Sequence, residues 1–210
     1  MGELVQLADL RQRRRFREVS DPVRPQLFVD LADPFSYLAA ERLERRLPRV
    51  RWKLACQRAL ERADVIDEDA LFDAAERRAA DLRLPLQWPD NFPAPVPAAM
   101  RAASYAIEAG RGGEFIIAAG RLAFCGGFDL DDPEVLMEAA AASGIALDAC
   151  LEAAGDVSRD APIEAAGRRL LALGADHLPV LRMGGAFVSG EGRISAFLAA
   201  GAPVRAFGTP

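Results

Sequence analysis

A short apolar run that leads directly into a helix start is the feature that most constrains the fold of this chain. Residues 27–31 (Leu-Phe-Val-Asp-Leu) are typical of a buried strand. Asp33 followed by Pro34 is typical of a helix N-terminus, because the Asp33 side chain can cap the first amides and proline sets the backbone angle of the first turn. Unpaired N–H groups and a positive dipole end make such a corner favourable for an anionic group.

The segments on either side of the corner predict an α/β unit. An amphipathic helix is expected over residues 34–47, and residues 50–55 alternate like a strand with one solvated side. A right-handed crossover makes the two strands parallel. Towards the C-terminus we expect a helix that begins at Pro162 and runs to residue 173, then two apolar strands joined by a Gly-Gly turn at 184–185.

The middle of the chain has a helical pattern instead. Five helices are expected there, over residues 70–84, 96–109, 113–124, 133–143 and 147–154. A proline-dense loop at 85–95 separates the first two, because no helix passes through such a segment. The predicted organisation is an N-terminal extension at 1–24, one α/β domain formed by 25–62 and 157–210, and a helical insert at 63–156.

Composition excludes several classes of function. A chain of 210 residues with a net charge of -5 offers one ordinary core and no argument for binding nucleic acid. No stretch resembles a signal peptide or reaches transmembrane length, so we expect a cytoplasmic protein without a membrane partner. The three cysteines form no Cys-x-x-Cys pair, and no cluster has the spacing of a metal site. The arginine-rich stretch at 11–17 is either a solvated helix or arm that lies on the domain, or an arm that docks a partner or binds an anion.

The corner resembles the DsbA-like group of thioredoxin-fold proteins. Asp33-Pro34-Phe35-Ser36 stands where the redox members carry Cys-Pro-x-Cys and where kappa-class glutathione transferases and 2-hydroxychromene-2-carboxylate isomerases carry Ser-Pro-x-Ser. The match is to the isomerase and transferase branch, with Asp33 in place of its serine. The resemblance implies a thioredoxin-like α/β fold with an inserted all-helical domain, and Asp33 and Ser36 are the catalytic candidates.

A second resemblance lies near the C-terminus. Leu178-Pro179-Val180 is similar to the strand start at which the thioredoxin fold places a cis-proline opposite the corner, although an ordinary trans proline is the alternative. In glutathione-binding relatives the backbone of the residue before this proline binds the cysteinyl part of the ligand. Residues 190–193 resemble their Gly-x-Asp-Arg motif for the glutamyl end, with Gly192 in place of Asp and Glu191 as a substitute. The resemblance implies glutathione or another low-molecular-weight thiol as cofactor, no metal, and these cofactor-binding residues: Leu178, Pro179, Gly190 and Glu191.

The proline-dense loop contains a Phe92-Pro93 pair that is similar to one found near the active site of these relatives. Trp88 and Phe92 are expected either to form the wall of an apolar substrate pocket or to fill the core. His177, the only histidine, either serves as an acid or base beside Pro179 or points away from it. The expected pocket residues are Phe35, Trp88, Asn91, Phe92 and His177.

Three functions follow from this resemblance. The first is an enzyme in which a thiol attacks a small apolar electrophile, with Asp33 as general base and Ser36 as hydrogen-bond donor to the thiolate; relatives commonly dimerise, so a homodimer is expected. The second is an inactive binding protein in which Asp33 is only a helix cap. The third, a thiol-disulfide oxidoreductase, is disfavoured because positions 33 and 36 lack the cysteine that supplies the nucleophilic thiolate.

Overall fold

The computed structural model describes residues 24–47, 49–60 and 68–200. The predicted extension therefore lies outside the described residues except for Arg24, and so do residues 61–67 and 201–210.

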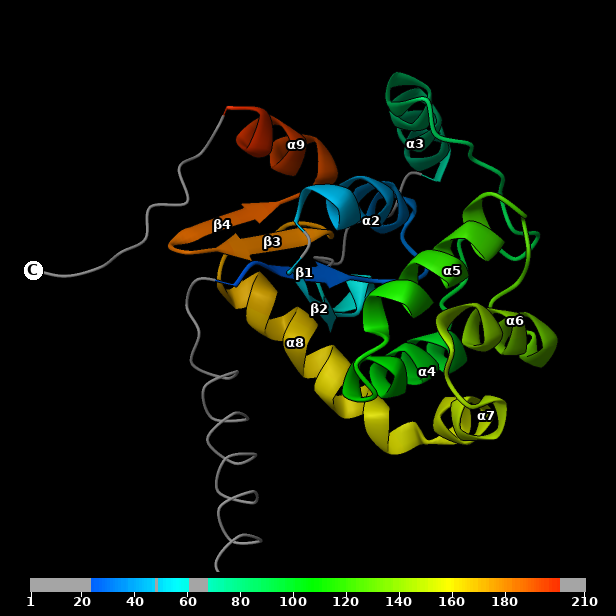
Figure 1. Ribbon diagram of the computed structural model, residues 1–210. Coiled ribbons are helices and arrows are strands. Elements are labelled where there is room, and N and C mark those ends of the chain that lie inside the picture. The colour runs from blue at the N-terminus through cyan, green and yellow to red at the C-terminus, as the bar shows by residue number, and fades with distance from the viewer. Residues whose placement is uncertain (1–23, 48, 61–67, 201–210) are drawn as a thin grey trace, which may run out of the picture.

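Within the described part, four strands form one sheet in the order β2-β1-β3-β4 (Figure 1). The strands are β1 (Gln26–Val29), β2 (Arg51–Leu54), β3 (Val180–Met183) and β4 (Ala186–Ser189). Strand β1 pairs with β2 in parallel, as the crossover predicted, and with β3 in the antiparallel direction. Strands β3 and β4 form the expected hairpin. Strand β1 buries Leu27 and Val29 completely, so the corner follows directly from a strand that is anchored in the core.

Helices cover both faces of this sheet. Helix α2 (Pro34–Arg46) and helix α9 (Glu191–Ala199) lie on one face, and helix α8 (Asp160–Ala172) crosses the other (Figure 1). The prediction that α8 begins at Pro162 is wrong. A short 3-10 turn η2 (Val157–Arg159), capped by Asp156, leads directly into α8, so Pro162 falls inside the first turn, where its missing N–H costs no hydrogen bond.

The middle of the chain is helical, as predicted. The helices are α3 (Glu68–Leu82), α4 (Pro97–Glu108), α5 (Gly112–Phe124), α6 (Pro133–Ser143) and α7 (Leu147–Gly155). Helices α4 to α7 pack on one another, and α5 also packs against α2. None of the described helices is both long and apolar enough to cross a membrane.

The main hydrophobic core joins the sheet to the helical insert. It runs from Leu27 and Val29 through Leu38 on α2 to Phe115 and Phe124 on α5. A smaller core lies beneath α8, and it is built from Ala55, Leu60, Leu170, Ala175, Leu178 and Val180. The insert therefore forms one wall around the corner and is continuous with the core that positions it.

Candidate functional site at the strand-to-helix corner

Asp33 closes the N-terminus of α2. Its Oδ1 accepts the N–H of Phe35 at 3.2 Å, and its Oδ2 accepts the N–H of Ser36 at 2.8 Å. The Ser36 hydroxyl donates to the same Oδ2 at 2.6 Å. The side chain is therefore held in one orientation, and the whole of Asp33 is only 8% exposed.

Burial governs the acidity of this carboxyl. Removal from water, with a smaller contribution from the neighbouring Asp30 charge, raises the pKa of Asp33 from an ordinary 3.8 to about 7. The hydrogen bonds from Ser36 and Phe35 act in the opposite direction without cancelling the effect. A carboxyl with this pKa exchanges protons near neutrality, which an exposed aspartate does not do.

Asp30 supports the corner from the end of β1. Its Oδ1 accepts the N–H of Ala32 at 2.9 Å and its Oδ2 accepts the N–H of Gln57 at 2.8 Å, while its own N–H donates to the Ser36 hydroxyl at 3.2 Å. Ser36 is thus bound on both sides, and its proton is held by Asp33. Asp30 was not predicted as a site residue, although an acidic side chain within the apolar run 27–31 was an available signal.

The Leu178–Pro179 peptide is cis, as predicted. The Leu178 N–H, expected to meet a ligand, donates instead to Oε1 of Gln57 at 2.8 Å, and Leu178 is only 1% exposed. The Pro179 carbonyl accepts the N–H of Gly190 at 2.8 Å. Gln57 therefore links the Leu178–Pro179 segment, through its side chain, to Asp30, through its backbone N–H. Nothing in the local sequence indicated this role.

Glu191 lies at the first position of α9 and is buried. It pairs with Arg42 of α2 at 3.0 Å and with Arg78 of α3, and its Oε1 accepts the Ser195 hydroxyl at 2.5 Å. Burial is the largest single influence and raises the pKa of Glu191, but the hydrogen bonds from Arg78, Ser195 and Arg42 and the Arg78 charge together outweigh it and hold this pKa below its usual range. The Glu191 carboxylate therefore binds side chains of the protein itself and links α9 to α2 and α3.

His177 lies on the surface, directly before the cis Leu178–Pro179 peptide. Its Nδ1 is 3.4 Å from an Asp176 carboxylate oxygen, its Nε2 is 3.2 Å from an Arg193 nitrogen, and its side chain is 55% exposed. The pair with Arg193 and the hydrogen bond from Ser189 help to hold the pKa of Asp176 at about 2 despite partial burial. His177 is thus part of a surface charge cluster and lines none of the pockets described below.

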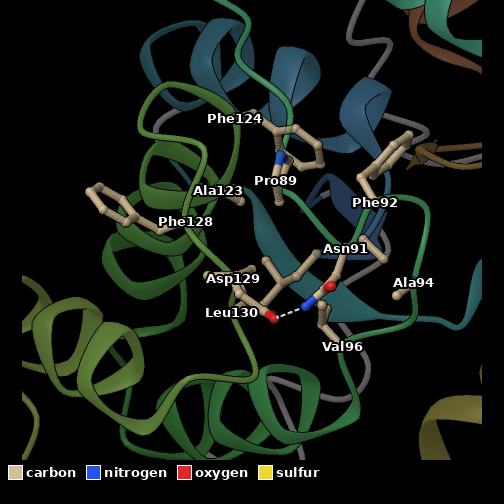
Figure 2. Close-up of a pocket in the computed structure, with 12 residues that line it drawn as sticks. Pro89, Asn91, Phe92, Ala94, Val96, Ala123, Phe124, Phe128, Asp129 and Leu130 are labelled. Atoms are coloured by element: carbon tan, nitrogen blue, oxygen red, sulfur yellow. Dashed lines mark hydrogen bonds between the residues drawn. The ribbon is translucent and has the colours of Figure 1, made fainter.

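An apolar pocket opens beside the corner, between the proline-dense loop and the end of α5 (Figure 2). Leu31 and Ala32, which directly precede Asp33, form part of its wall. The Asn91 amide donates to an Asp129 carboxylate oxygen across its rim (Figure 2). The cavity is about 20 Å³, room for roughly one water molecule. The remaining wall residues are Pro89, Phe92, Ala94, Val96, Ala123, Phe124, Phe128 and Leu130.

The expected pocket residues separate into two groups. Phe92 and Asn91 line the pocket. Trp88 packs in an aromatic cluster with Phe72 and Phe92, at ring centroid distances of 4.4 and 4.7 Å, and its Nε1 donates to Glu76 at 2.9 Å. Phe35 is half-buried against the main core. Trp88 therefore supports Phe92 from behind, and only Phe92 of the two forms a wall.

The described residues contain no group of three or more histidine, cysteine, aspartate or glutamate side chains arranged to hold a metal. Cys125 is exposed at the end of α5, with its Sγ 2.9 Å from the Tyr37 hydroxyl.

Comparison with known proteins places this fold. No family model matches the chain, and no curated protein does. Among solved structures, a 2-hydroxychromene-2-carboxylate isomerase is similar with a TM-score of 0.70 and 14% identity, over 85% of this chain and 94% of that one. A protein assigned as a DsbA oxidoreductase from Streptomyces coelicolor is similar with a TM-score of 0.66 and 20% identity, over 89% and 92%.

A third structure, assigned as a protein disulfide isomerase from Nitrosomonas europaea, has a TM-score of 0.53 and 14% identity, over 84% of this chain and 98% of that one. The sheet order, the corner, the cis-proline and the inserted helices thus make up a DsbA-like thioredoxin fold, as the sequence predicted.

Proposed function

We propose that this protein is an isomerase-type enzyme that moves a proton within a small apolar molecule, with Asp33 as general acid and base. The observation that carries the proposal is a carboxyl group only 8% exposed, held at a helix N-terminus and directly preceded in the chain by two residues of an apolar pocket. A carboxyl that merely caps a helix gains nothing from this burial.

The chemistry follows from the two states of Asp33. The ionised carboxylate takes a proton from an acidic C–H or O–H bond, and the electron pair remains on the conjugated substrate. The carboxylic acid formed in this step returns the proton to another atom of the same molecule, so the reaction consumes no co-reactant. A pKa of about 7 makes both directions of transfer accessible near neutral pH. The Phe35 and Ser36 amides stabilise the ionised state before the substrate arrives.

We propose further that glutathione is not bound in the manner that the resemblance implies. The Leu178 N–H is used by Gln57, Glu191 is buried between Arg42 and Arg78, and Gly192 brings no carboxylate. Neither the strand-like donor nor the glutamyl-binding group is available. The proposed reaction therefore runs without a thiol, and millimolar glutathione should leave the melting temperature of the protein unchanged. A rise of several degrees would contradict this point.

The central experiment compares two Asp-to-Asn variants. The first probe is 2-hydroxychromene-2-carboxylate, the compound that appears in the name of one structural neighbour. A panel of aromatic oxo acids follows, and turnover of each compound is monitored by ultraviolet absorbance. Asp33→Asn should lower turnover at least 100-fold, because an amide still caps the helix but carries no proton at this pH. Asp132→Asn is the matched control, since Asp132 caps α6 before Pro133 but is exposed.

Unchanged turnover in Asp33→Asn would show that Asp33 is only a cap. Two observations favour a second candidate, a binding protein: both Asp33 oxygens already accept hydrogen bonds, and the neighbouring cavity is about 20 Å³. Absence of turnover across the whole panel by the unaltered protein, together with saturable binding of a panel member, would establish that alternative.

A further inference from the structure

A second and larger hollow lies on the opposite side of the sheet. It is a groove of about 440 Å³ between the sheet, α8 and α4, on the face that α8 crosses (Figure 1). It shares no wall residue with the pocket beside the corner. A volume of this size is typical of small-molecule sites, whereas the pocket beside the corner is far smaller.

The floor of this groove is apolar because strand side chains alternate between the two faces of a sheet. Leu27 and Val29 of β1 point into the main core, and Gln26 and Phe28 point into the groove. Helices α8 and α4 add side chains from the other side. The apolar residues that line it are Phe28, Leu54, Ile107, Pro162, Ile163, Ala166, Leu170 and Leu173.

Three cationic side chains line this groove and have no ion-pair partner among the described residues. They are Lys53 of β2, Arg169 of α8 and Arg182 of β3. Glu108 is the one carboxylate among the lining residues, and it is paired with Arg159 at 2.9 Å. The groove therefore combines an apolar floor with an excess of positive charge.

The same face of the sheet carries one more unsatisfied cation. Arg51 stands opposite Gln26 in the register of β1 and β2 and so shares the face on which Gln26 lines the groove. Its Nη2 is buried and has no hydrogen-bond partner in the described part of the chain. A buried donor without an acceptor is costly, which favours an anion on this side of the sheet.

We propose that the groove binds an amphipathic anion, a molecule with an apolar body and a single carboxylate. The body lies over Phe28 and Ile107, and the carboxylate lies between Lys53 and Arg182. The chain's own first residues are a poor occupant, because positions 11–17 carry five arginines that the same cations repel. The proposal does not depend on the chemistry of Asp33, and Asp33→Asn should leave this binding unchanged.

The test is calorimetric titration of the full-length protein with dodecanoate below its micelle concentration. Acetate supplies the charge without the tail, and dodecyltrimethylammonium supplies the tail with the opposite charge. Dodecanoate alone should bind saturably at one site. Arg182→Gln and Lys53→Gln should each weaken its affinity about five- to tenfold, because a charge-assisted hydrogen bond is lost.

Two neighbours on α8 give the matched pair of variants. Arg169→Gln should weaken dodecanoate binding, and Arg168→Gln should not, because Arg168 points to solvent and pairs with Glu164 at 3.2 Å. Ala166→Phe should abolish binding by filling the groove while every charge remains. Circular dichroism verifies that each variant is folded.

Three results would overturn the proposal. The first is equal binding of the cationic detergent, which would reveal unspecific adsorption to apolar surface. The second is an equal loss of affinity in Arg168→Gln and Arg169→Gln, which would indicate only a general effect of net charge. The third is the absence of saturable dodecanoate binding, the result expected if part of the chain itself fills the groove.

Discussion

Asp33 is subject to two opposing influences at the scale of a single residue. The amides at the start of α2 stabilise its charge, and burial destabilises it by more. Because its pKa in the folded protein, about 7, exceeds its ordinary value of 3.8, the native state holds the proton more tightly than the unfolded chain. The contribution of Asp33 to stability is therefore fully present below pH 4 and is lost as the pH rises to about 7.

Asp33→Asn should remove this dependence on pH. The variant retains a capping side chain that cannot ionise, so its free energy of unfolding should fall less than that of the unaltered protein between pH 5 and pH 8. We expect the gap to reach on the order of 2 kcal/mol. Urea denaturation at several pH values measures it, and titration of other groups cancels in the difference. Parallel curves for the two proteins would contradict the elevated pKa.

Ser36 tunes this carboxyl, and its removal should shift the pKa upwards. The hydroxyl donates to Asp33 Oδ2 at 2.6 Å and thereby lowers a pKa that burial has raised. In Ser36→Ala the rising limb of turnover against pH should move to higher pH. Ser158→Ala is the control, since its hydroxyl also donates to a capping aspartate, Asp156, at 2.6 Å but on the surface. An unchanged limb in Ser36→Ala would show that Asp33 is not the titrating group.

The sequence predicted the cap but not the contacts around it. Asp33, Pro34 and Ser36 are neighbours in the chain, and cap geometry is a local property. Asp30 binds the amide of Gln57, 27 positions away, and Gln57 binds the Leu178 amide, 121 positions away. Such contacts join residues that are far apart in the chain and depend on how the segments around β1 and the cis-proline pack together. They leave no periodic pattern in a single sequence, so they could not be predicted from it.

At the scale of secondary-structure elements, hydrophobic periodicity and caps predicted most helices, but the role of Glu191 was not predictable. The sequence supported either a ligand contact or an ordinary first-turn acid. In the structure this side chain is buried and pairs with Arg42 of α2 and Arg78 of α3. Its charge therefore holds the insert against the thioredoxin unit, and a sequence pattern within α9 contains no information about α3.

Glu191→Gln should destabilise the protein by on the order of 2 kcal/mol, because it leaves two partly buried arginines without their carboxylate. The expected loss of stability is moderate because the Arg42 and Arg78 side chains are 25% and 26% exposed, so water screens part of the interaction. Hydrogen exchange should accelerate first in α3. Glu164→Gln is the control, because it breaks only an exposed pair with Arg168 and should cost less than 0.5 kcal/mol. Equal effects of the two variants would refute this role.

At the scale of the whole molecule, two cores with different locations hold the fold together. The main core joins the sheet to the insert, whereas the smaller core packs α8 against the sheet and the segment around η1 (Gln57–Ala59). The α/β order and the inserted helices were predictable, because they follow from the succession of strand and helix patterns. The division of the apolar residues between two cores was not, since it depends on which helix faces which side of the sheet.

Gly167 is a point of close approach between α8 and η1. A Cβ at this position would lie 2.7 Å from the Ala59 Cβ and 2.7 Å from the Cys56 carbonyl oxygen, so α8 would have to move away. Gly167→Ala should cost about 1–3 kcal/mol despite the better helix propensity of alanine. Displacement of η1 would also disturb the hydrogen bonds of Gln57 to Asp30 and Leu178, so turnover should fall as well.

Gly155 at the end of α7 is the matched control, because a Cβ there meets nothing within 4 Å. Gly155→Ala should be neutral or stabilising by up to about 1 kcal/mol. Thermal unfolding and turnover are measured on both variants. Loss of stability in Gly167→Ala with normal turnover would show that the corner is held by the main core alone, and that the chain of contacts through Gln57 does not position Asp33.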